Sequence, residues 1–172
     1  MLPIKTLFAP TARRAAPPHR VERDLLLLPV RPDPDRHRRR EFEQRAPGAF
    51  TVGGVMRIDE NKRPYLWLDA AKLCLDSDPT MRFVIVGDGP LLQSVRNHAE
   101  SIGIAGRVLF VGRSSRVGFW LSKLNLFMLL SRFEGMPNVL IEAQAVGVPV
   151  ITTPAGGAAE TVREGITGTV LS

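Results

Sequence analysis

From residue 50 onward, short apolar runs alternate with segments whose apolar residues recur at helical spacing. The apolar runs are rich in β-branched residues and predict buried strands at 50–55, 82–87, 107–112, 124–130, 148–152 and 168–171. The segments between them predict helices at 64–76, 91–102, 117–122, 138–146 and 157–164. Strands alternate with helices throughout, so consecutive strands are expected to run in the same direction.

Two of the expected helices have an apolar face that can be named from the spacing. For 64–76 the predicted buried face is Leu66, Ala70, Leu73 and Cys74, with Pro64 in the first turn. For 91–102 it is Leu91, Val95, Ala99 and Ile102. Continuous apolar strands flanked by such helices predict an α/β fold with a Rossmann-like, doubly wound parallel sheet. Ligands of such sheets bind beyond the carboxyl ends of the strands, which are here Gly53-Gly54, Gly87, Gly112, Ser131 and Thr153-Pro154.

Residues 1–48 differ from the rest in composition. They are rich in Pro and Arg and show no sustained period, apart from a short helix expected near 38–44. We therefore divide the chain into an irregular leader or interdomain connector at 1–48 and a folded domain at 49–172. The connector-like segment includes "RPDPDRHRRREFEQRAPG".

The net charge of +6 comes mainly from the first 50 residues, which hold 11 Lys/Arg and six Asp/Glu. The remaining chain is nearly neutral, so a nucleic-acid partner is not expected. A solvated segment is the preferred interpretation of "RHRRR" (36–40), and binding to an anionic surface is the alternative. No apolar run reaches the ~18 residues that a membrane-spanning helix needs. Pro and Arg interrupt the N-terminus too early for a signal peptide, and the single cysteine, Cys74, fits a reducing cytoplasm.

The stretch "SRFEGMPNVLIEAQAVGVPVI" (131–151) places one glutamate before an expected helix and another inside it. The backbone N–H groups of Met136, Asn138, Val139 and Leu140 are predicted to point out of the helix N-terminus, which favours phosphate. Glu142 lies on the same side of the helix as Asn138, by i, i+4 spacing. A carboxylate repels phosphate, so Glu134 and Glu142 are expected to accept hydrogen bonds from hydroxyls on either side of a diphosphate.

A diphosphate between two sets of hydroxyls describes a nucleotide-sugar, with the ribose on one side and the hexose on the other. Its charge requires cations, and Arg57 and Lys62 follow the first strand at the same edge of the sheet.

Four segments in order, "GGVMRIDENKRP", "FVIVGDGP", "VLFVG" and "SRFEGMPNVLIEAQAVGVPVITTPAGGAAE", resemble the C-terminal domain of retaining GT-B glycosyltransferases of group 1, also called GT4. The resemblance covers about residues 50–172 and implies transfer of a hexose from a nucleotide diphosphate with retention of configuration. It implies no metal and no other cofactor. It assigns a catalytic part to Glu134, Arg57 and Lys62. The donor-binding residues that it implies are Gly54, Gly112, Arg113, Gly135, Met136, Pro137, Asn138, Val139, Leu140 and Glu142.

The family has a second, N-terminal lobe that holds the acceptor, and residues 1–49 cannot form it. We therefore expect a fragment, a split half or a truncated gene product that also lacks closing C-terminal helices. The partners implied are a nucleotide-sugar and, through the other lobe, an acceptor glycan or lipid-linked sugar. The resemblance to this family also implies a location in the cytoplasm, at the inner membrane surface, with peripheral membrane association.

Several alternatives remain open at this stage. The chain could be a nucleotide-sugar-binding module without activity, or an unrelated interaction domain. Asn138 could cap its helix. "GDGP" (87–90) begins like a dinucleotide fingerprint but lacks the third glycine. "PAGGAAE" (154–160) could be a simple turn, or its glycines could let a donor sugar approach the backbone.

Overall fold

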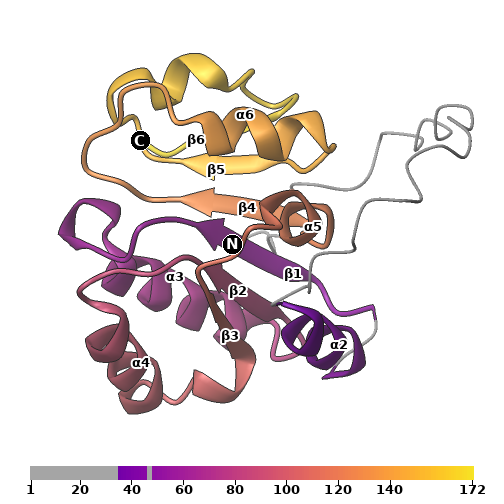
Figure 1. Cartoon of the computed structure of the whole chain (residues 1–172). Coiled ribbons are helices and arrows are strands. Elements are labelled where there is room, and N and C mark those ends of the chain that lie inside the picture. Colours follow the sequence, from indigo (N-terminus) through magenta and orange to yellow (C-terminus); the bar gives the residue numbers. More distant parts are fainter. Residues whose placement is uncertain (1–34, 46–47) are drawn as a thin grey trace, which may run out of the picture.

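The computed structural model describes residues 35–45 and 48–172, and it contains a six-stranded sheet in which every neighbouring pair is parallel. The strand order is β3-β2-β1-β4-β5-β6 (Figure 1). The strands are β1 (Thr51–Val55), β2 (Arg82–Val86), β3 (Val108–Gly112), β4 (Leu126–Leu129), β5 (Val150–Thr152) and β6 (Gly168–Val170). The predicted α/β fold with a parallel sheet is confirmed.

The helices cover the sheet on two faces, each with its own apolar cluster. One face carries α3 (Pro64–Ser77) and α4 (Leu92–Ser101). The other carries α2 (Arg36–Arg45), α5 (Val117–Ser122) and α6 (Asn138–Ala145). The described residues also include three short 3-10 helices: η1 (Glu60–Lys62), η2 (Ala105–Arg107) and η3 (Gly156–Thr161). No helix in the described ranges is long and apolar enough to cross a membrane.

The strand order creates a switch point between β1 and β4. From β1 the chain adds β2 and β3 on one side, and then returns to add β4 on the other side of β1. Val52 pairs with Leu126 and Gly53 with Phe127, so the two strands are direct neighbours. Crossovers leave β1 and β4 toward opposite halves of the sheet, and a crevice forms where their carboxyl ends lie together.

The buried face of α3 differs from the predicted one. Leu66 and Leu73 are exposed, and the side chains inside are Pro64, Trp67, Leu68, Ala71 and Leu75. Apolar residues surround this helix on several sides, so their spacing did not single out one face. The face predicted for α4 is confirmed at its centre, where Val95 and Ala99 are fully buried.

The helix predicted at 157–164 is instead the 3-10 helix η3. It begins at Gly156, whose φ of +53° is a left-handed conformation that only glycine adopts at low cost. Ala158 N–H bonds Ala155 O at 3.1 Å, and Val162 N–H bonds Ala159 O at 3.2 Å, both i→i+3 bonds. After Thr161 the chain turns into β6, so no α-helix follows.

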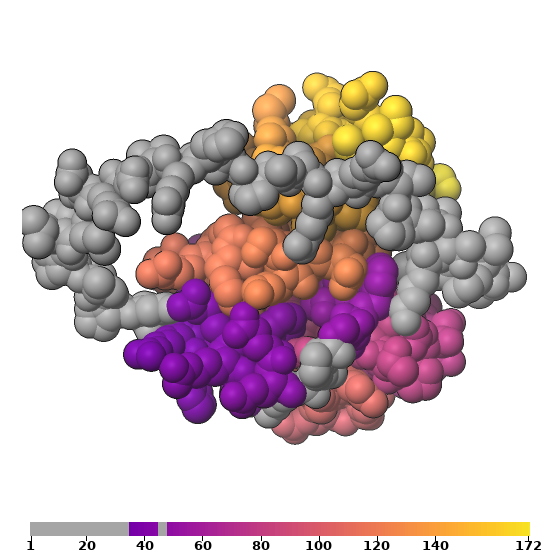
Figure 2. Space-filling model, turned by 90° about the vertical axis from the view of Figure 1, so that its right-hand side faces the viewer, coloured from indigo at the N-terminus to yellow at the C-terminus, as the bar shows by residue number. Residues whose placement is uncertain are grey.

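Helix α2 belongs to the packed body, although it precedes residue 49. Phe42 is buried and meets Trp120 of α5 edge-to-face, with ring centroids 5.8 Å apart. Arg82 of β2 donates to Phe42 O at 2.6 Å and lies over the Phe42 ring. Figure 2 shows the indigo atoms of this segment directly against the orange atoms of α5. The short helix expected near 38–44 is therefore present, longer than predicted and folded onto the domain.

Candidate donor-binding site at the carboxyl edge of the sheet

The loop after β1 lies flat against the end of β2. Met56 and Ile58 are buried, while the side chain of Arg57 between them is 72% exposed. Met56 N–H bonds Val86 O at 2.9 Å, and Ile58 N–H bonds Asp88 O at 3.0 Å. A Cβ at Gly87 would lie 1.8 Å from Met56 O, and one at Gly89 would lie 2.3 Å from Ile58 O. The two glycines of "GDGP" therefore have a structural reason, which is the close approach of the protein's own loop.

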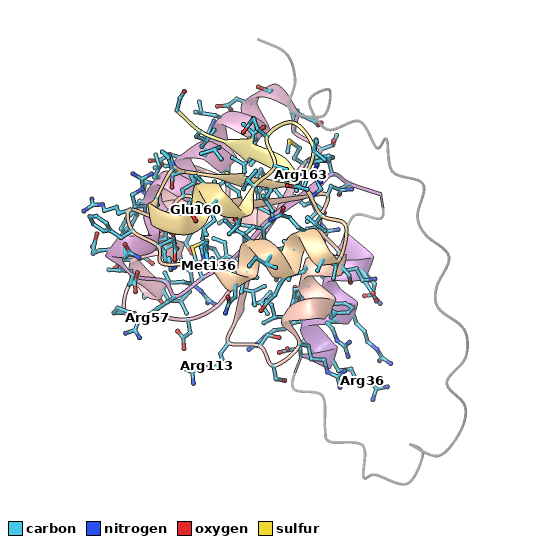
Figure 3. The ribbon with its side chains drawn as sticks, turned by 90° about the horizontal axis from the view of Figure 1, so that it is seen from above. Arg36, Arg57, Arg113, Met136, Glu160 and Arg163 are labelled. Atoms are coloured by element: carbon cyan, nitrogen blue, oxygen red, sulfur yellow. The ribbon has the colours of Figure 1, made fainter. Side chains whose placement is uncertain are left out.

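A cleft of about 780 Å³ opens over the carboxyl ends of β1, β2 and β3. Three of the predicted site residues, Arg57, Lys62 and Arg113, line it. Figure 3 shows Arg57 and Arg113 projecting from the same end of the molecule. The other lining residues are Val55, Met56, Val86, Gly87, Asp88, Gly89, Pro90, Ser114 and Val117. The cleft thus combines cations with backbone from two glycines.

Lys62 connects this cleft to the loop after β4. Its ammonium group forms an ion pair with Glu134, and the two side chains are only 21% and 10% exposed. Asp59 holds the backbone of Lys62 in place, because its carboxylate accepts a hydrogen bond from Lys62 N–H at 3.2 Å and caps η1. Asp59 also lies 3.3 Å from Arg57 Nε. The predicted cations and the first glutamate are therefore brought together at the β1–β4 switch point.

The N-terminus of α6 has the form expected of an anion site, with one exception. Pro137 is the N-cap, and no side chain caps the helix, so Asn138 is the first helical residue rather than a cap. Among the described residues nothing accepts a hydrogen bond from the N–H groups of Met136, Asn138 or Val139. Leu140 is the exception: its N–H donates to Pro137 O at 3.0 Å and its side chain is fully buried.

The second glutamate, Glu142, is exposed on α6, one turn after the exposed Asn138. Neither residue lines the cleft over β1 to β3, nor does any other described residue of α6. The predicted residues thus form two adjoining parts, the cleft with its cations and the α6 N-terminus, and the Lys62–Glu134 pair lies between them.

The predicted glycines occupy different environments. Gly54 is buried in β1, where a Cβ would lie 2.6 Å from Met56 Cε and 3.2 Å from Met128 O. It is enclosed by protein and does not line the cleft. Gly112 ends β3 with φ +75°, and its carbonyl accepts from Gly87 N–H at 2.9 Å. Gly135 is exposed in the loop between Glu134 and Met136.

The glycines of "PAGGAAE" pack against the chain itself. A Cβ at Gly156 would lie 1.9 Å from Glu134 O, and one at Gly157 would lie 2.4 Å from Gly135 O. Thr153 Oγ1 donates to Ser131 O at 2.7 Å. The chain before and at the start of η3 thus supports the loop that carries Glu134. Figure 3 shows Glu160, from the same 3-10 helix, above Met136.

Three polar side chains at or beside the site were not expected from the sequence: Asn61, Asp88 and Ser114. Asp88 and Ser114 line the cleft. Ser114 Oγ donates to the fully buried Asp35, which also lies 3.5 Å from an Arg38 guanidinium nitrogen. Asn61 bonds the backbone of the β4–α6 loop. Within the described ranges, no three His, Cys, Asp or Glu side chains are grouped so that they could hold a metal ion.

Comparisons with known proteins bear on this arrangement. The family "Glycosyl transferases group 1" matches residues 35–172. The Vi polysaccharide biosynthesis protein VipC/TviE of Salmonella typhi is 53% identical over 132 residues, which cover 76% of this chain and 23% of that protein. The chain therefore spans about a quarter of the length of this relative.

Two solved structures show the same fold. Anabaena HepE in complex with UDP-glucose superposes with a TM-score of 0.70 and 25% identity, over 80% of this chain and 38% of that one. The C-terminal domain of the glycosyl transferase group 1 protein LpcC from Francisella tularensis superposes with a TM-score of 0.67 and 22% identity, over 76% and 71%. The sheet and its helices are those of the C-terminal domain of a GT-B glycosyltransferase. The family match over most of the chain and this shared fold agree with the order of the sequence motifs, and the chain belongs to the group 1 glycosyltransferases.

Proposed function

We propose that this domain binds a UDP-sugar and presents its hexose for transfer, with retention of configuration, to an acceptor glycan or lipid-linked sugar in polysaccharide or glycolipid synthesis. The observation that carries the proposal is the meeting of Lys62 and Glu134 at the switch point, next to a cleft lined by Arg57 and Arg113. The named functions of the relatives support it: one acts in Vi polysaccharide biosynthesis, and HepE has been solved with UDP-glucose.

The charges suggest how the donor would lie. The diphosphate would sit between Lys62, Arg57 and the N–H groups of Met136, Asn138 and Val139, because these positive groups adjoin one another at the β1–β4 switch point. Arg113 and Ser114 would then face the base, while Glu142 would accept hydrogen bonds from the ribose hydroxyls. Glu134 would lie beside the hexose. Lys62, Arg57 and the helix N-terminus would stabilise the negative charge that develops on the departing UDP, which is an electrostatic form of catalysis.

Donor binding must rearrange the Lys62–Glu134 pair. In the structure Glu134 neutralises the ammonium group that the diphosphate would need. A carboxylate that releases Lys62 is then free to accept a hydrogen bond from a sugar hydroxyl. The exchange replaces one ion pair by two charge-assisted contacts, from Lys62 to the diphosphate and from a sugar hydroxyl to Glu134. The energetic cost of breaking the ion pair is therefore offset when the donor carries both the diphosphate and the hexose.

Titration of the chain with UDP-glucose, GDP-mannose and ADP-glucose, followed by backbone amide shifts, tests the proposal. We expect saturable shifts with UDP-glucose at 134–139 and 112–114. Glu142→Ala is expected to weaken UDP-glucose binding about tenfold, which corresponds to ~1.4 kcal/mol and to the loss of hydrogen bonds to a charged acceptor. Glu100→Ala, an exposed glutamate at the far end of α4, is the matched control. Unchanged affinity in Glu142→Ala contradicts the ribose assignment, and the absence of shifts with all three donors contradicts the function.

A second candidate is a donor-binding module that does not transfer the sugar by itself. It is favoured by the site itself, since the residues brought together at the switch point are those expected to contact the donor. An assay of UDP release and sugar transfer with the purified chain separates the two candidates. Turnover above the rate of the Lys62→Met variant supports the enzyme, and binding without turnover supports the module.

The proposal includes a location in the cytoplasm at the membrane surface. Arg36, Arg38 and Arg40 are exposed on α2 and could contact anionic lipid headgroups. Cosedimentation with vesicles that contain phosphatidylglycerol tests this part. Absence of binding by the unsubstituted chain would contradict the location, and binding that persists after all three arginines are replaced by glutamine would contradict the part assigned to α2.

A further inference from the structure

The 3-10 helix η1 is attached to the loop after β4 by a side chain that no sequence motif identified. Asn61 Nδ2 donates to Phe133 O at 3.0 Å, and Phe133 N–H donates to Asn61 Oδ1 at 3.1 Å. A third bond runs from Arg132 N–H to the backbone carbonyl of Asn61 at 2.8 Å. The side-chain amide thus pairs with both polar groups of one backbone residue, as a neighbouring strand would.

These bonds continue a series that begins at the sheet. Trp67 Nε1 donates to Met128 O at 3.0 Å, and Arg63 Nε donates to Leu130 O at 2.6 Å. The residues from 61 to 67 therefore follow the chain as it leaves β4, and they satisfy its polar groups where no strand does. Arg63 adopts φ +46° to begin α3 in this position, which is costly for a residue with a Cβ.

We call the two bonds between the Asn61 side chain and the Phe133 backbone the Asn61 clamp, and the two residues of the ion pair follow directly after the two residues of this clamp. Lys62 follows Asn61, and Glu134 follows Phe133, so the clamp fixes their separation. The Phe133 side chain is 77% exposed and does not anchor the loop in the core. This loop is accordingly connected to η1 by the two Asn61 side-chain bonds, the backbone bond from Arg132 and the Lys62–Glu134 ion pair.

We propose that Asn61 is a positioning residue, which holds the β1–α3 and β4–α6 loops in register so that Lys62 and Glu134 reach the same donor molecule. The inference rests on the proposed function, and it adds a residue that touches neither phosphate nor sugar. A small displacement of a positioned charge has large effects on a site of this kind. Asn is suited to the task because its short amide carries one donor and one acceptor with little side-chain freedom.

Amide hydrogen exchange in the ligand-free chain is the first test. Asn61→Ala removes both side-chain bonds to Phe133 but keeps the backbone bond that Arg132 makes. We expect exchange of the Phe133 amide to accelerate at least about tenfold, in keeping with the loss of neutral hydrogen bonds, while Arg132 changes less. We also expect the NMR signal of the Lys62 ammonium group to broaden. Asn97→Ala, which removes an exposed amide bonded to Gln93 on α4, is the control. Unchanged Phe133 exchange overturns the inference.

The second test compares UDP-glucose with UMP, which keeps the ribose but lacks both the second phosphate and the glucose. Asn61→Ala should weaken UDP-glucose binding about tenfold and UMP binding less than about twofold, since UMP does not need Lys62 and Glu134 together. A purely structural role would weaken both ligands alike. In the Glu134→Gln background the effect of Asn61→Ala should shrink, because the two residues act through one pair.

If the effects of Asn61→Ala and Glu134→Gln on the free energy of UDP-glucose binding are fully additive, the inference is overturned. The proposed function is left intact by that result. If the unsubstituted chain fails to bind UDP-glucose, the proposed donor is wrong instead. The exchange measurement then still decides whether Asn61 positions the two loops.

Discussion

The contact between η3 and the Glu134 loop makes Gly156 a position where one methyl group should have a large effect. Two costs arise when Gly156 is replaced by alanine. A residue with a Cβ at φ +53° is strained, by about 1–2 kcal/mol. The new Cβ would also lie 1.9 Å from Glu134 O, so the backbone of the loop must move. Overpacking of this kind costs a further ~1–3 kcal/mol.

Gly165→Ala separates the two costs. Gly165 has a similar positive φ of +70°, but no atom lies within 4 Å of the position that its Cβ would occupy. The free energy of unfolding of Gly165→Ala should therefore fall only by the cost of the strained backbone conformation, without the overpacking cost. For a chain of this size, 1 kcal/mol lowers Tm by roughly 2–4 °C. We expect a decrease of about 2–8 °C for Gly165→Ala, and a decrease for Gly156→Ala that is larger by at least about 2 °C, from the smallest overpacking cost above.

Urea unfolding followed by tryptophan fluorescence measures the free energies directly, because Trp67 and Trp120 are both fully buried. Gly156→Ala should also weaken UDP-glucose binding, since the displaced carbonyl belongs to Glu134. Gly165→Ala should not affect binding. Equal destabilisation by the two substitutions would show that the loop accommodates the methyl group freely, and would refute the argument that η3 supports Glu134.

Two further predictions concern Asp35 and Cys74, which lie outside the Lys62–Glu134 pair. Asp35→Ala should destabilise the chain by about 1–3 kcal/mol, because it removes a fully buried carboxylate that accepts a hydrogen bond from the half-buried Ser114 hydroxyl; urea unfolding measures this, and a change below ~0.5 kcal/mol would contradict it. Burial raises the pKa of the Cys74 thiol above its usual value, so the protonated form is favoured in the folded state. The contribution of the protonated Cys74 thiol to the free energy of unfolding is therefore complete below the pKa of the thiol in the unfolded chain. This contribution is lost as the pH rises through the pKa of the thiol in the folded chain. Alkylation by iodoacetamide at pH 8 should be slower in the folded chain than in urea, and equal rates would contradict the raised pKa.

The sequence predicted the sheet because its strands are continuous apolar runs with glycine or polar residues at their ends. It also predicted which loops carry the cations and glutamates, since these lie at strand ends in a parallel sheet. The face of α3 could not be predicted from spacing, as Leu66 and Leu73 are as apolar as the residues that are buried. Period alone does not choose between two apolar faces of one helix.

The support of the site was not visible in the sequence for a different reason. Asn61 and Phe133 are 72 positions apart, and a side-chain-to-backbone bond requires no particular residue at the second position. The glycines of "PAGGAAE" gave a signal that could be interpreted in two ways, as a simple turn or as an approach for the donor sugar. In the structure they lie against the backbone of Glu134 and Gly135, which is a contact within the protein. Whether a sugar also lies there stays a prediction.

The strand order has a consequence for how this domain acquires its site. Lys62 and Glu134 lie in the loops that follow two neighbouring strands, β1 and β4, and between these strands the chain forms α3 and two further β–α units, β2 with α4 and β3 with α5. The long intervening chain must be closed before they meet, and closures of that length are slow steps in folding. A nucleotide-sugar that needs both residues would therefore recognise only the finished domain, and would pull the folding equilibrium toward it. Binding competence should thus appear last during refolding, after the half of the sheet formed by β1 to β3 is already in place.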